Sequence, residues 1–337
     1  MAPPRTSLVD DLIGEILLRV RPDDATSLAR ASLVCKSWRG LLSDPAFGCN
    51  YRALHGTPPL LGYLQVLKGD DPYSSRFVST STAALRPAVR DFSDWLVLDC
   101  RHGRVLFAAS SPDAGGTTVD LVVWNPVTDE HCHLPTLPKR AGREFNAAVL
   151  CAAEGCDHVD CCRHGGPFRV VFVASASNVK NATSARVYSS ESGGWSKATV
   201  AYHRGFVWVD MMPSVLVGDA LYFSCGRDFT LECKLSTQLK LSMIPTPARL
   251  NGTCIVIIKA QDGLLSFVDV EGSSVNLWSL LEVDAHGFPR WVRSRTIELE
   301  TMLPEDALPS PNTVKASLDI CEWLCGRHRC HLCALIW

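Results

Sequence analysis

Two clusters of cysteine and histidine contain the residues of this sequence whose types and spacing could bind a metal. The first cluster consists of Cys151, Cys156, His158, Cys161, Cys162 and His164. The second lies close to the end of the chain and consists of Cys321, Cys325, His328, Cys330, His331 and Cys333. Zinc takes four nitrogen or sulfur ligands in a tetrahedron, and closely spaced cysteines let one loop surround the ion.

The second cluster has the spacing that is closer to a zinc site. Two residues separate Cys330 from Cys333, and three separate Cys321 from Cys325. These four cysteines are therefore the candidate metal ligands. The first cluster lacks a second closely spaced pair, and a Gly-rich insertion explains it equally well. We expect no cofactor, and a zinc-binding or redox protein stays open as an alternative.

Motifs of other chemistries are missing from the sequence. There is no Gly-x-Ser-x-Gly nucleophile turn, no His-Glu-x-x-His and no Gly-rich phosphate loop. The acidic pairs Asp10-Asp11 and Asp23-Asp24 suit helix starts, where capping explains them. The segment Arg101-His102-Gly103-Arg104 predicts a solvated basic turn, with contact to a substrate as the alternative. We therefore expect a protein that is not an enzyme.

Composition narrows the class of protein further. The 337 residues carry 33 Lys+Arg and 35 Asp+Glu, a net charge of −2, so we expect no nucleic-acid partner. A hydrophobic content of 47% with 20% charged residues predicts a globular chain. No apolar run approaches the ~18 residues of a membrane-spanning helix, and acidic residues interrupt any signal peptide. We expect a soluble, intracellular protein in the cytoplasm and/or nucleus, with no membrane partner. In that reducing environment its 15 cysteines are expected to be thiols or metal ligands.

The first fifty residues predict a small all-α domain of three helices. Leu12, Ile16 and Val20 recur at helical spacing within residues 8–20, and Pro22 ends that stretch. A second helical stretch is predicted from Ser27 to about Ser43, and Pro45 closes the unit. Helices this short and few bury little surface, so an apolar face is left that needs a partner.

Beyond about Pro58 the sequence predicts short strands separated by turns, with no sustained helical period. The expected strands are 60–66, 95–98, 105–108, 121–124, 169–173, 185–188, 214–217, 220–224, 254–258, 264–268 and 275–278. Gly, Pro, Asp and Asn fill the gaps, as at Gly103, Gly193-Gly194, Gly218-Asp219 and Asp262-Gly263. This part of the chain is therefore expected to be all-β.

A loose internal repeat indicates which all-β fold. Trp124, Tyr188, Cys233 and Trp278 occupy equivalent slots, at spacings of 64, 45 and 45 residues. Several units end in a Pro-marked exit, such as Leu134-Pro135 and Ile244-Pro245. Propeller blades take roughly 40–50 residues, and an insertion at 151–167 explains the longer first interval. A β-propeller is the preferred fold, with an incomplete or irregularly closed ring left open, and a β-sandwich is the alternative.

The N-terminal segment resembles an F-box. The residues that carry this resemblance are Leu8, Asp10-Asp11-Leu12, Glu15-Ile16-Leu17, Arg19-Val20, Ser27-Leu28-Ala29-Arg30-Ala31, Leu33-Val34-Cys35-Lys36-Ser37-Trp38-Arg39 and Leu41-Leu42-Ser43-Asp44-Pro45-Ala46-Phe47. One departure is Val9, which stands where F-boxes usually have a proline after the opening leucine.

The rest of the chain resembles the F-box-associated, propeller-like (kelch-like) region of a large plant family, especially of grasses. Its motifs are Arg101-His102-Gly103-Arg104-Val105, Val123-Trp124-Asn125-Pro126, Gly166-Pro167-Phe168-Arg169-Val170-Val171-Phe172 and Val217-Gly218-Asp219-Ala220-Leu221-Tyr222. The expected domains are an F-box at residues 5–48 and a recognition domain at 58–312. Residues 313–337 are a divergent Cys/His-rich tail.

The resemblance implies a non-catalytic substrate receptor of an SCF-type ubiquitin ligase. The F-box would dock on a Skp-type adaptor, and through it on a cullin, while the β-domain captures a target protein. By that analogy the residues that face the adaptor or hold its docking surface are Leu8, Leu12, Ile16, Leu17, Leu28, Val34 and Trp38. For Leu28, Val34 and Cys35, packing only among the three helices is the alternative. Trp38 is the preferred anchor, because buried aromatic residues dominate interface energetics. An adaptor-binding scaffold or decoy without ligase output is the alternative within this family.

Overall fold

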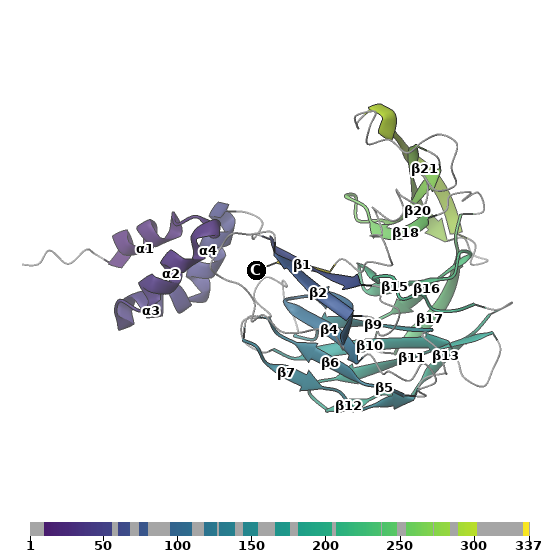
Figure 1. Cartoon of the computed structure of the whole chain (residues 1–337), viewed down its shortest axis with the longest axis horizontal. Helices are drawn as coiled ribbons and strands as arrows, with labels where there is room; N and C mark the ends of the chain where they lie inside the picture. The colour runs from purple at the N-terminus through teal and green to yellow at the C-terminus, as the bar shows by residue number, and fades with distance from the viewer. Residues whose placement is uncertain are drawn as a thin grey trace, which may run out of the picture. The chain divides into compact units, whose positions relative to one another are not determined.

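The computed structural model contains a group of α-helices followed by a series of β-sheets (Figure 1). It describes residues 10–55, 60–67, 74–79, 95–109, 118–126, 128–138, 144–153, 166–175, 181–203, 207–236, 238–247, 254–271, 273–283, 289–301 and 333–336. The chain divides into two compact units, one with the helices and one with most of the sheets. No helix among the described residues is long and apolar enough to cross a membrane.

Four α-helices form the N-terminal unit's helical lobe, which we define as residues 10–55. They are α1 (Asp10–Leu18), α2 (Ala25–Ser32), α3 (Lys36–Ser43) and α4 (Pro45–His55), with a 3-10 turn η1 (Pro22–Asp24) before α2. The sequence predicted three helices ending by residue 48, whereas the structure has four α-helices and the last runs to His55. Two local features explain the difference.

The stretch predicted as one helix over 27–43 is interrupted, and Pro45 begins a helix rather than ending one. Leu33 ends α2, and Cys35 has extended backbone angles before α3 starts. Asp44 accepts a hydrogen bond from the backbone N–H of Ala46 at 2.8 Å, as an N-terminal capping residue does. Proline is well tolerated in the first turn of a helix, where its missing N–H is not needed.

A small core holds the lobe together. Ile13 and Leu17 on α1 and Ala31 on α2 are buried. The partly buried residues that pack against them are Leu28, Trp38, Leu41, Leu42 and Phe47. The start of α2 is fixed by Asp24, whose carboxylate accepts hydrogen bonds from the N–H and hydroxyl of Ser27. All four helices therefore contribute to one apolar centre.

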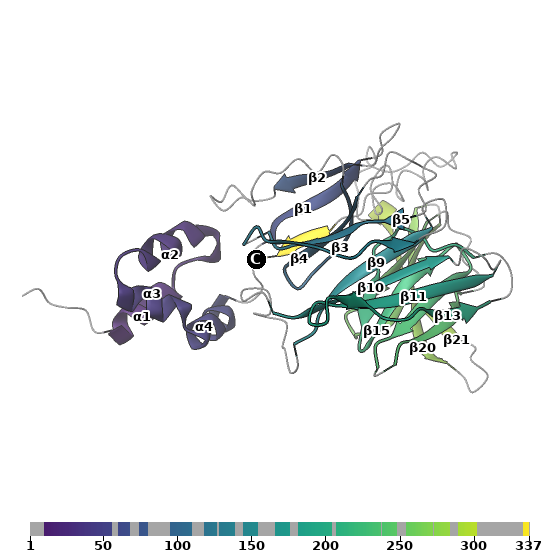
Figure 2. The same cartoon turned by 90° about the horizontal axis from the view of Figure 1, so that it is seen from below.

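In the described part of residues 95–298, which we call the β-domain, four antiparallel meanders follow one another. The first sheet contains β3 (Trp95–Arg101), β4 (Arg104–Ala109), β6 (Leu121–Trp124) and β7 (His131–His133). The second contains β9 (Phe145–Cys151), β10 (Phe168–Ser175), β11 (Ala182–Ser189), β12 (Gly194–Trp195) and β13 (Thr199–Tyr202), the last paired with β11. Figure 2 shows β9, β10 and β11 side by side in this order.

The third sheet contains β14 (Val215–Val217), β15 (Ala220–Cys225), β16 (Phe229–Lys234) and β17 (Lys240–Pro245). The fourth contains β18 (Cys254–Lys259), β19 (Leu265–Glu271), β20 (Ser274–Val283) and β21 (Pro289–Glu298), followed by η2 (Leu299–Thr301). A two-stranded sheet consists of β5 (Thr118–Val119) and β8 (Leu137–Pro138). A three-stranded sheet has the order β2 (Ser74–Ser79), β1 (Leu60–Leu67) and β22 (Cys333–Ile336). The described residues do not define a closed ring of sheets.

The repeat predicted from the sequence is confirmed by the positions of its four marker residues. Trp124 lies on β6, Tyr188 on β11, Cys233 on β16 and Trp278 on β20. Each of these is the third strand of its sheet. The predicted insertion falls between β9 and β10, the first two strands of the second sheet. Consecutive four-stranded meanders at this period are the arrangement of propeller blades.

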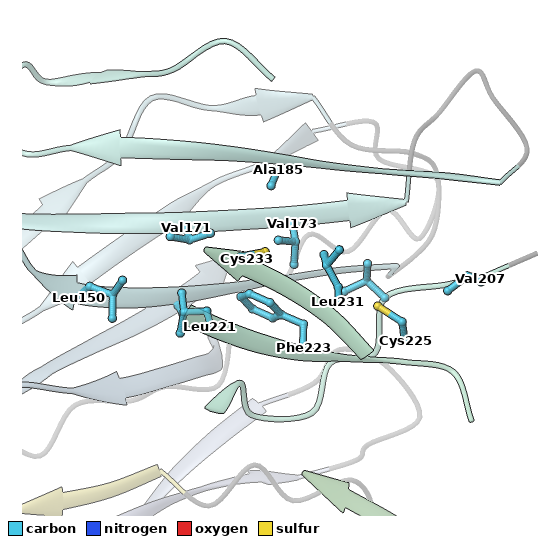
Figure 3. Packing of buried hydrophobic residues seen from close by; sticks show 12 residues of the cluster. Leu150, Val171, Val173, Ala185, Val207, Leu221, Phe223, Cys225, Leu231 and Cys233 are labelled. Carbon is cyan, nitrogen blue, oxygen red and sulfur yellow. The ribbon is translucent and has the colours of Figure 1, made fainter. Parts of the chain in front are cut away.

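Both faces of the third sheet are covered by its neighbours. Leu221 and Phe223 on β15 and Leu231 on β16 join Val171 and Val173 of the second sheet in one buried cluster (Figure 3). The alternate residues of β15, Ala220 and Tyr222, pack instead toward Phe267 and Leu265 of the fourth sheet. Because side chains alternate along a strand, each face of a blade can contact a different neighbour.

In two sheets, a tryptophan on an edge strand hydrogen-bonds the sheet before it. Trp195 on β12 donates a hydrogen bond from Nε1 to the carbonyl oxygen of Pro135 at 2.8 Å. Trp291 on β21 does the same to Pro245 at 2.9 Å. These acceptors are the proline-marked exits seen in the sequence, so those residues have a structural role between sheets.

Candidate partner-binding surface

The helical lobe exposes apolar side chains that its own core does not cover. On α1, Ile13 and Leu17 point inward with 7% and 5% exposure, while Leu12 and Ile16 are each 54% exposed. Residues four apart share a helix face, so Leu12 and Ile16 form a second apolar stripe beside the buried one. The apolar surface of α1 is therefore wider than the lobe can bury.

A second exposed apolar site lies where α2 meets α3. Leu33 and Val34 are 73% and 63% exposed in the break between these helices. Large apolar side chains this exposed on a small domain commonly mark a surface that contacts another protein. Together, Leu12, Ile16, Leu33 and Val34 define what we call the lobe surface.

The residues predicted to face the adaptor occupy three kinds of position. Leu12, Ile16 and Val34 are exposed. Leu17 is buried, and Leu28 and Trp38 are partly buried against the lobe core. Leu8 lies outside the described residues. Leu33 and Leu54, exposed at 73% and 59%, were not among the predicted contact residues.

The structure also explains what keeps α1 in place behind its exposed stripe. The hydroxyl of Tyr51 on α4 donates to the carbonyl oxygen of Val20 at 2.7 Å. The Nε2 of His55 hydrogen-bonds the carbonyl oxygen of Leu18 at 2.6 Å. Carbonyls at the end of a helix have no partner within it, so α4 supplies a partner to Leu18, the last residue of α1, and another to Val20 just beyond it. The extension of α4 to His55 thus holds the end of α1.

The cysteine clusters are placed as follows. Of the second cluster, the described part of the chain leaves out Cys321, Cys325 and Cys330. For Cys333 it gives the backbone, as part of strand β22, but not the side chain. Of the first cluster it includes only Cys151. Across the described ranges, no group of three or more His, Cys, Asp or Glu could hold a metal ion.

Cys35, Cys225, Cys233 and Cys254 lie in apolar segments, where the sequence favours small buried residues. Cys225 and Cys233 are buried in the β-domain, whereas Cys35 is exposed, and the side chain of Cys254 lies outside the described part of the chain. Burial raises the pKa of the Cys225 thiol to about 12 and also raises that of Cys233.

The turn Arg101-His102-Gly103-Arg104 differs from the solvated loop that was predicted. His102 and Gly103 have φ of 50° and 64°, the backbone of a tight two-residue hairpin between β3 and β4. Arg104 is only 4% exposed, and its Nη2 donates to the carbonyl oxygen of Gly166 at 2.6 Å. The two arginines therefore point into the β-domain rather than into solvent.

Comparison with known protein families decides the class of this chain. The F-box domain family matches residues 6–50, which contain α1, α2, α3 and the first half of α4. The family described as "F-box protein AT5G49610-like, beta-propeller" matches residues 96–320, about two thirds of the chain. The chain belongs to this family of F-box proteins. The four meanders are thus blades of the propeller of an F-box protein, and the predicted combination of an F-box with a propeller is confirmed.

Solved structures resemble this F-box protein only distantly. Three of them are BBS1N in complex with ARL6DN, Kuenenia stuttgartiensis hydrazine synthase and Hsv2 of Kluyvelomyces marxianus, at 10%, 11% and 10% identity. The matches cover 64%, 66% and 73% of this chain and 60%, 77% and 83% of those chains, with TM-scores of 0.32, 0.32 and 0.33. The chain therefore spans less than two thirds of the BBS1N chain. A search of curated proteins gave no match.

Proposed function

We propose that this plant-type F-box protein is a substrate receptor of an SCF-type ubiquitin ligase, in the cytoplasm and/or nucleus. In this proposal the lobe surface docks on a Skp-type adaptor, which joins the chain to a cullin, and the propeller captures a target. The chain itself carries out no chemistry. It contributes proximity, because holding target and ubiquitin-transfer machinery together replaces a collision with an oriented encounter.

The observation that carries this proposal is the exposed apolar stripe on α1. Leu12 and Ile16 are more than half exposed although they lie one residue from the buried Ile13 and Leu17. Completing the burial of these two half-exposed side chains against an apolar partner surface is favourable by roughly 1–1.5 kcal/mol each. Leu33 and Val34 offer further area of the same kind.

The test compares variants of α1 that change either the stripe or a neighbouring polar residue. The double variant Leu12→Asp/Ile16→Asp puts charge on the stripe, and Glu15→Gln is the matched control on an exposed position of the same helix. Each full-length chain is co-expressed with a Skp-type adaptor and purified through a tag on the adaptor. We expect the control to co-purify and the double variant to be lost.

Circular dichroism of each purified chain separates loss of docking from loss of folding. A double variant that keeps its helical signal and still binds the adaptor would contradict the proposed docking surface. The scaffold or decoy alternative is tested by deleting residues 5–48 in cells. A captured target whose abundance does not change on deletion would favour a scaffold over a ligase receptor.

A further inference from the structure

Two arginines at the β3–β4 hairpin lie directly opposite each other inside the β-domain. Arg101, the last residue of β3, pairs in register with Arg104, the first of β4. Residues directly opposite on antiparallel strands have Cβ atoms about 5 Å apart and share one face of the sheet. The hairpin therefore starts two cationic side chains from the same face of the sheet, although like charges repel.

Each guanidinium is only partly satisfied by the protein. The Nη2 of Arg101 donates to the carbonyl oxygen of Ser214, and the Nη2 of Arg104 to that of Gly166. The Nη1 atoms of both arginines are buried, and neither has a hydrogen-bond partner in the described part of the chain. The side chain of Arg101 is 16% exposed and Arg104 as a whole 4%. A buried charged donor without an acceptor is costly and calls for a partner.

The charges around this hairpin also indicate that the two arginines are short of negatively charged partners. Within the described residues, the carboxylate that ion-pairs with the hairpin is Asp99, 3.4 Å from the Nε of Arg101. Its other oxygen already accepts the backbone N–H of Val149 at 2.8 Å. Among the described residues, Arg101 therefore has one carboxylate partner and Arg104 has none. The aromatic ring of Phe168, 5.4 Å from the Arg104 guanidinium, adds attraction without charge.

We propose that Arg101 and Arg104 form a binding site for a small oxyanion of the phosphate class. Guanidinium groups match the oxygens of phosphate and carboxylate through paired N–H donors, and such charge-assisted hydrogen bonds are the stronger kind. Because Arg104 is almost completely buried, the ligand is a free anion and not a group on the surface of another protein. This site is independent of adaptor docking.

The site's position gives the anion a structural role. Arg101 hydrogen-bonds Ser214, the residue before β14 of the third sheet. Arg104 hydrogen-bonds Gly166, two residues before β10 of the second sheet. Both arginines belong to the first sheet. An anion bound to both guanidinium groups therefore stabilises the residues that connect three consecutive blades, so the stability of the propeller depends on its concentration.

Thermal unfolding of the full chain tests the site, with phosphate replacing chloride at constant ionic strength. Calorimetric titration with inorganic phosphate measures stoichiometry, and sulfate and acetate serve as tetrahedral and planar comparisons. The variants are Arg101→Gln and Arg104→Gln, and the control Arg227→Gln removes the same charge from an exposed turn. We expect a saturable rise in Tm with one phosphate per chain, retained in the control and at least tenfold weaker in affinity in both variants.

Three outcomes would overturn the proposal. The wild-type chain could lack saturable phosphate binding, which would mean that the two Nη1 groups are satisfied by water. Both variants could bind phosphate as the wild type does. The rise in Tm could be unsaturated and equal in every variant, which is a general salt effect. Should Arg104→Gln not fold, the less buried Arg101→Gln and the charge-preserving Arg104→Lys decide the question by the same titration.

Discussion

The indole of Trp291 donates its Nε1 hydrogen to the carbonyl oxygen of Pro245 at 2.9 Å, and Trp195 repeats this relationship with Pro135. In both cases the tryptophan also packs edge-on against a phenylalanine of its own sheet. The ring centroids are 4.8 Å apart for Phe267 and Trp291 and 6.3 Å apart for Phe172 and Trp195. One interaction thus joins two different pairs of successive blades.

Replacing either of these tryptophans with phenylalanine should destabilise the β-domain. Trp291→Phe removes the donor, leaves the Pro245 carbonyl without its partner and opens a gap, so we expect a loss of about 1–3 kcal/mol in the free energy of unfolding. Urea unfolding followed by circular dichroism measures it. Trp208→Phe is the control, because Trp208 is 42% exposed and bonds Asp210 in its own segment. Equal losses in the two variants would contradict a specific role between blades.

Trp38 should behave as a residue of the lobe core rather than as a surface anchor. It is partly buried against Ile13 and Leu17. We expect Trp38→Ala to lower the free energy of unfolding of the lobe by about 2–3 kcal/mol, somewhat less than for a fully buried tryptophan. Amide hydrogen exchange should become faster throughout α1 and α3. Leu12→Ala, at a 54% exposed position, should leave that exchange unchanged. Protection that survives Trp38→Ala would assign the side chain to the surface instead.

Asp99 should make the stability of the β-domain depend on pH. Its burial raises the pKa of its carboxyl above the ordinary value, and the opposing effects of Arg101 and the N–H of Val149 are smaller. The folded chain therefore binds this proton more tightly than the unfolded chain. The resulting stabilisation is full below the unfolded pKa of about 3.9 and is lost as pH rises through the folded pKa.

Asp99→Asn isolates this contribution, because the amide oxygen can still accept the Val149 N–H while the side chain no longer titrates. Urea midpoints of the wild type and the variant are compared from pH 4 to 7. We expect the wild type to lose stability relative to the variant as pH rises from about 4. Parallel curves across this range would show that the carboxyl has an ordinary pKa.

Thiol reactivity should divide the cysteines by burial. Cys35 and Cys49 are exposed, whereas Cys225 and Cys233 are buried in the β-domain. Because the thiolate is the reactive form, the raised pKa of Cys225, about 12, adds to its protection. We expect iodoacetamide to label Cys35 and Cys49 within minutes at pH 8, and Cys225 and Cys233 only when urea unfolds the chain. Mass spectrometry identifies the sites, and early labelling of Cys233 would contradict the packing of the second and third blades.

The sequence predicts the turns and at least two strands of every blade, because each blade repeats the same demands on its residues. The expected strands did not include β7, β12, β13, β16 and β17. Turn glycines at 103, 193, 218 and 263 all have positive φ, which L-residues rarely adopt, so these turns were readable. Strand β9 (Phe145–Cys151) was missed, since its first six residues are all buried and it shows no alternation. Strand β21 (Pro289–Glu298) was missed for the opposite reason, because most of it is exposed and carries three arginines.

The candidate surface was only partly predictable. Helical periodicity groups Leu12, Ile13, Ile16 and Leu17 on one apolar stripe, and nothing in that pattern says which half faces the core. The choice is made by the other helices, which cover Ile13 and Leu17 and leave Leu12 and Ile16 exposed. The break at Leu33–Cys35 is similarly hidden, because its apolar residues would also suit a continuous helix. Periodicity shows which side chains of a helix share an apolar face. Whether those side chains are exposed depends on how segments distant in the sequence pack against that face.

The two ends of the connection between β9 and β10 are hydrogen-bonded to each other. The backbone N–H of Ala152 donates to the carbonyl oxygen of Pro167 at 2.9 Å, and Cys151 pairs in register with Phe168 directly below. Strand alignment in the second blade is therefore decided before the intervening residues begin. We therefore expect changes of sequence or length between Ala152 and Pro167 to leave the pairing of β9 with β10 unchanged.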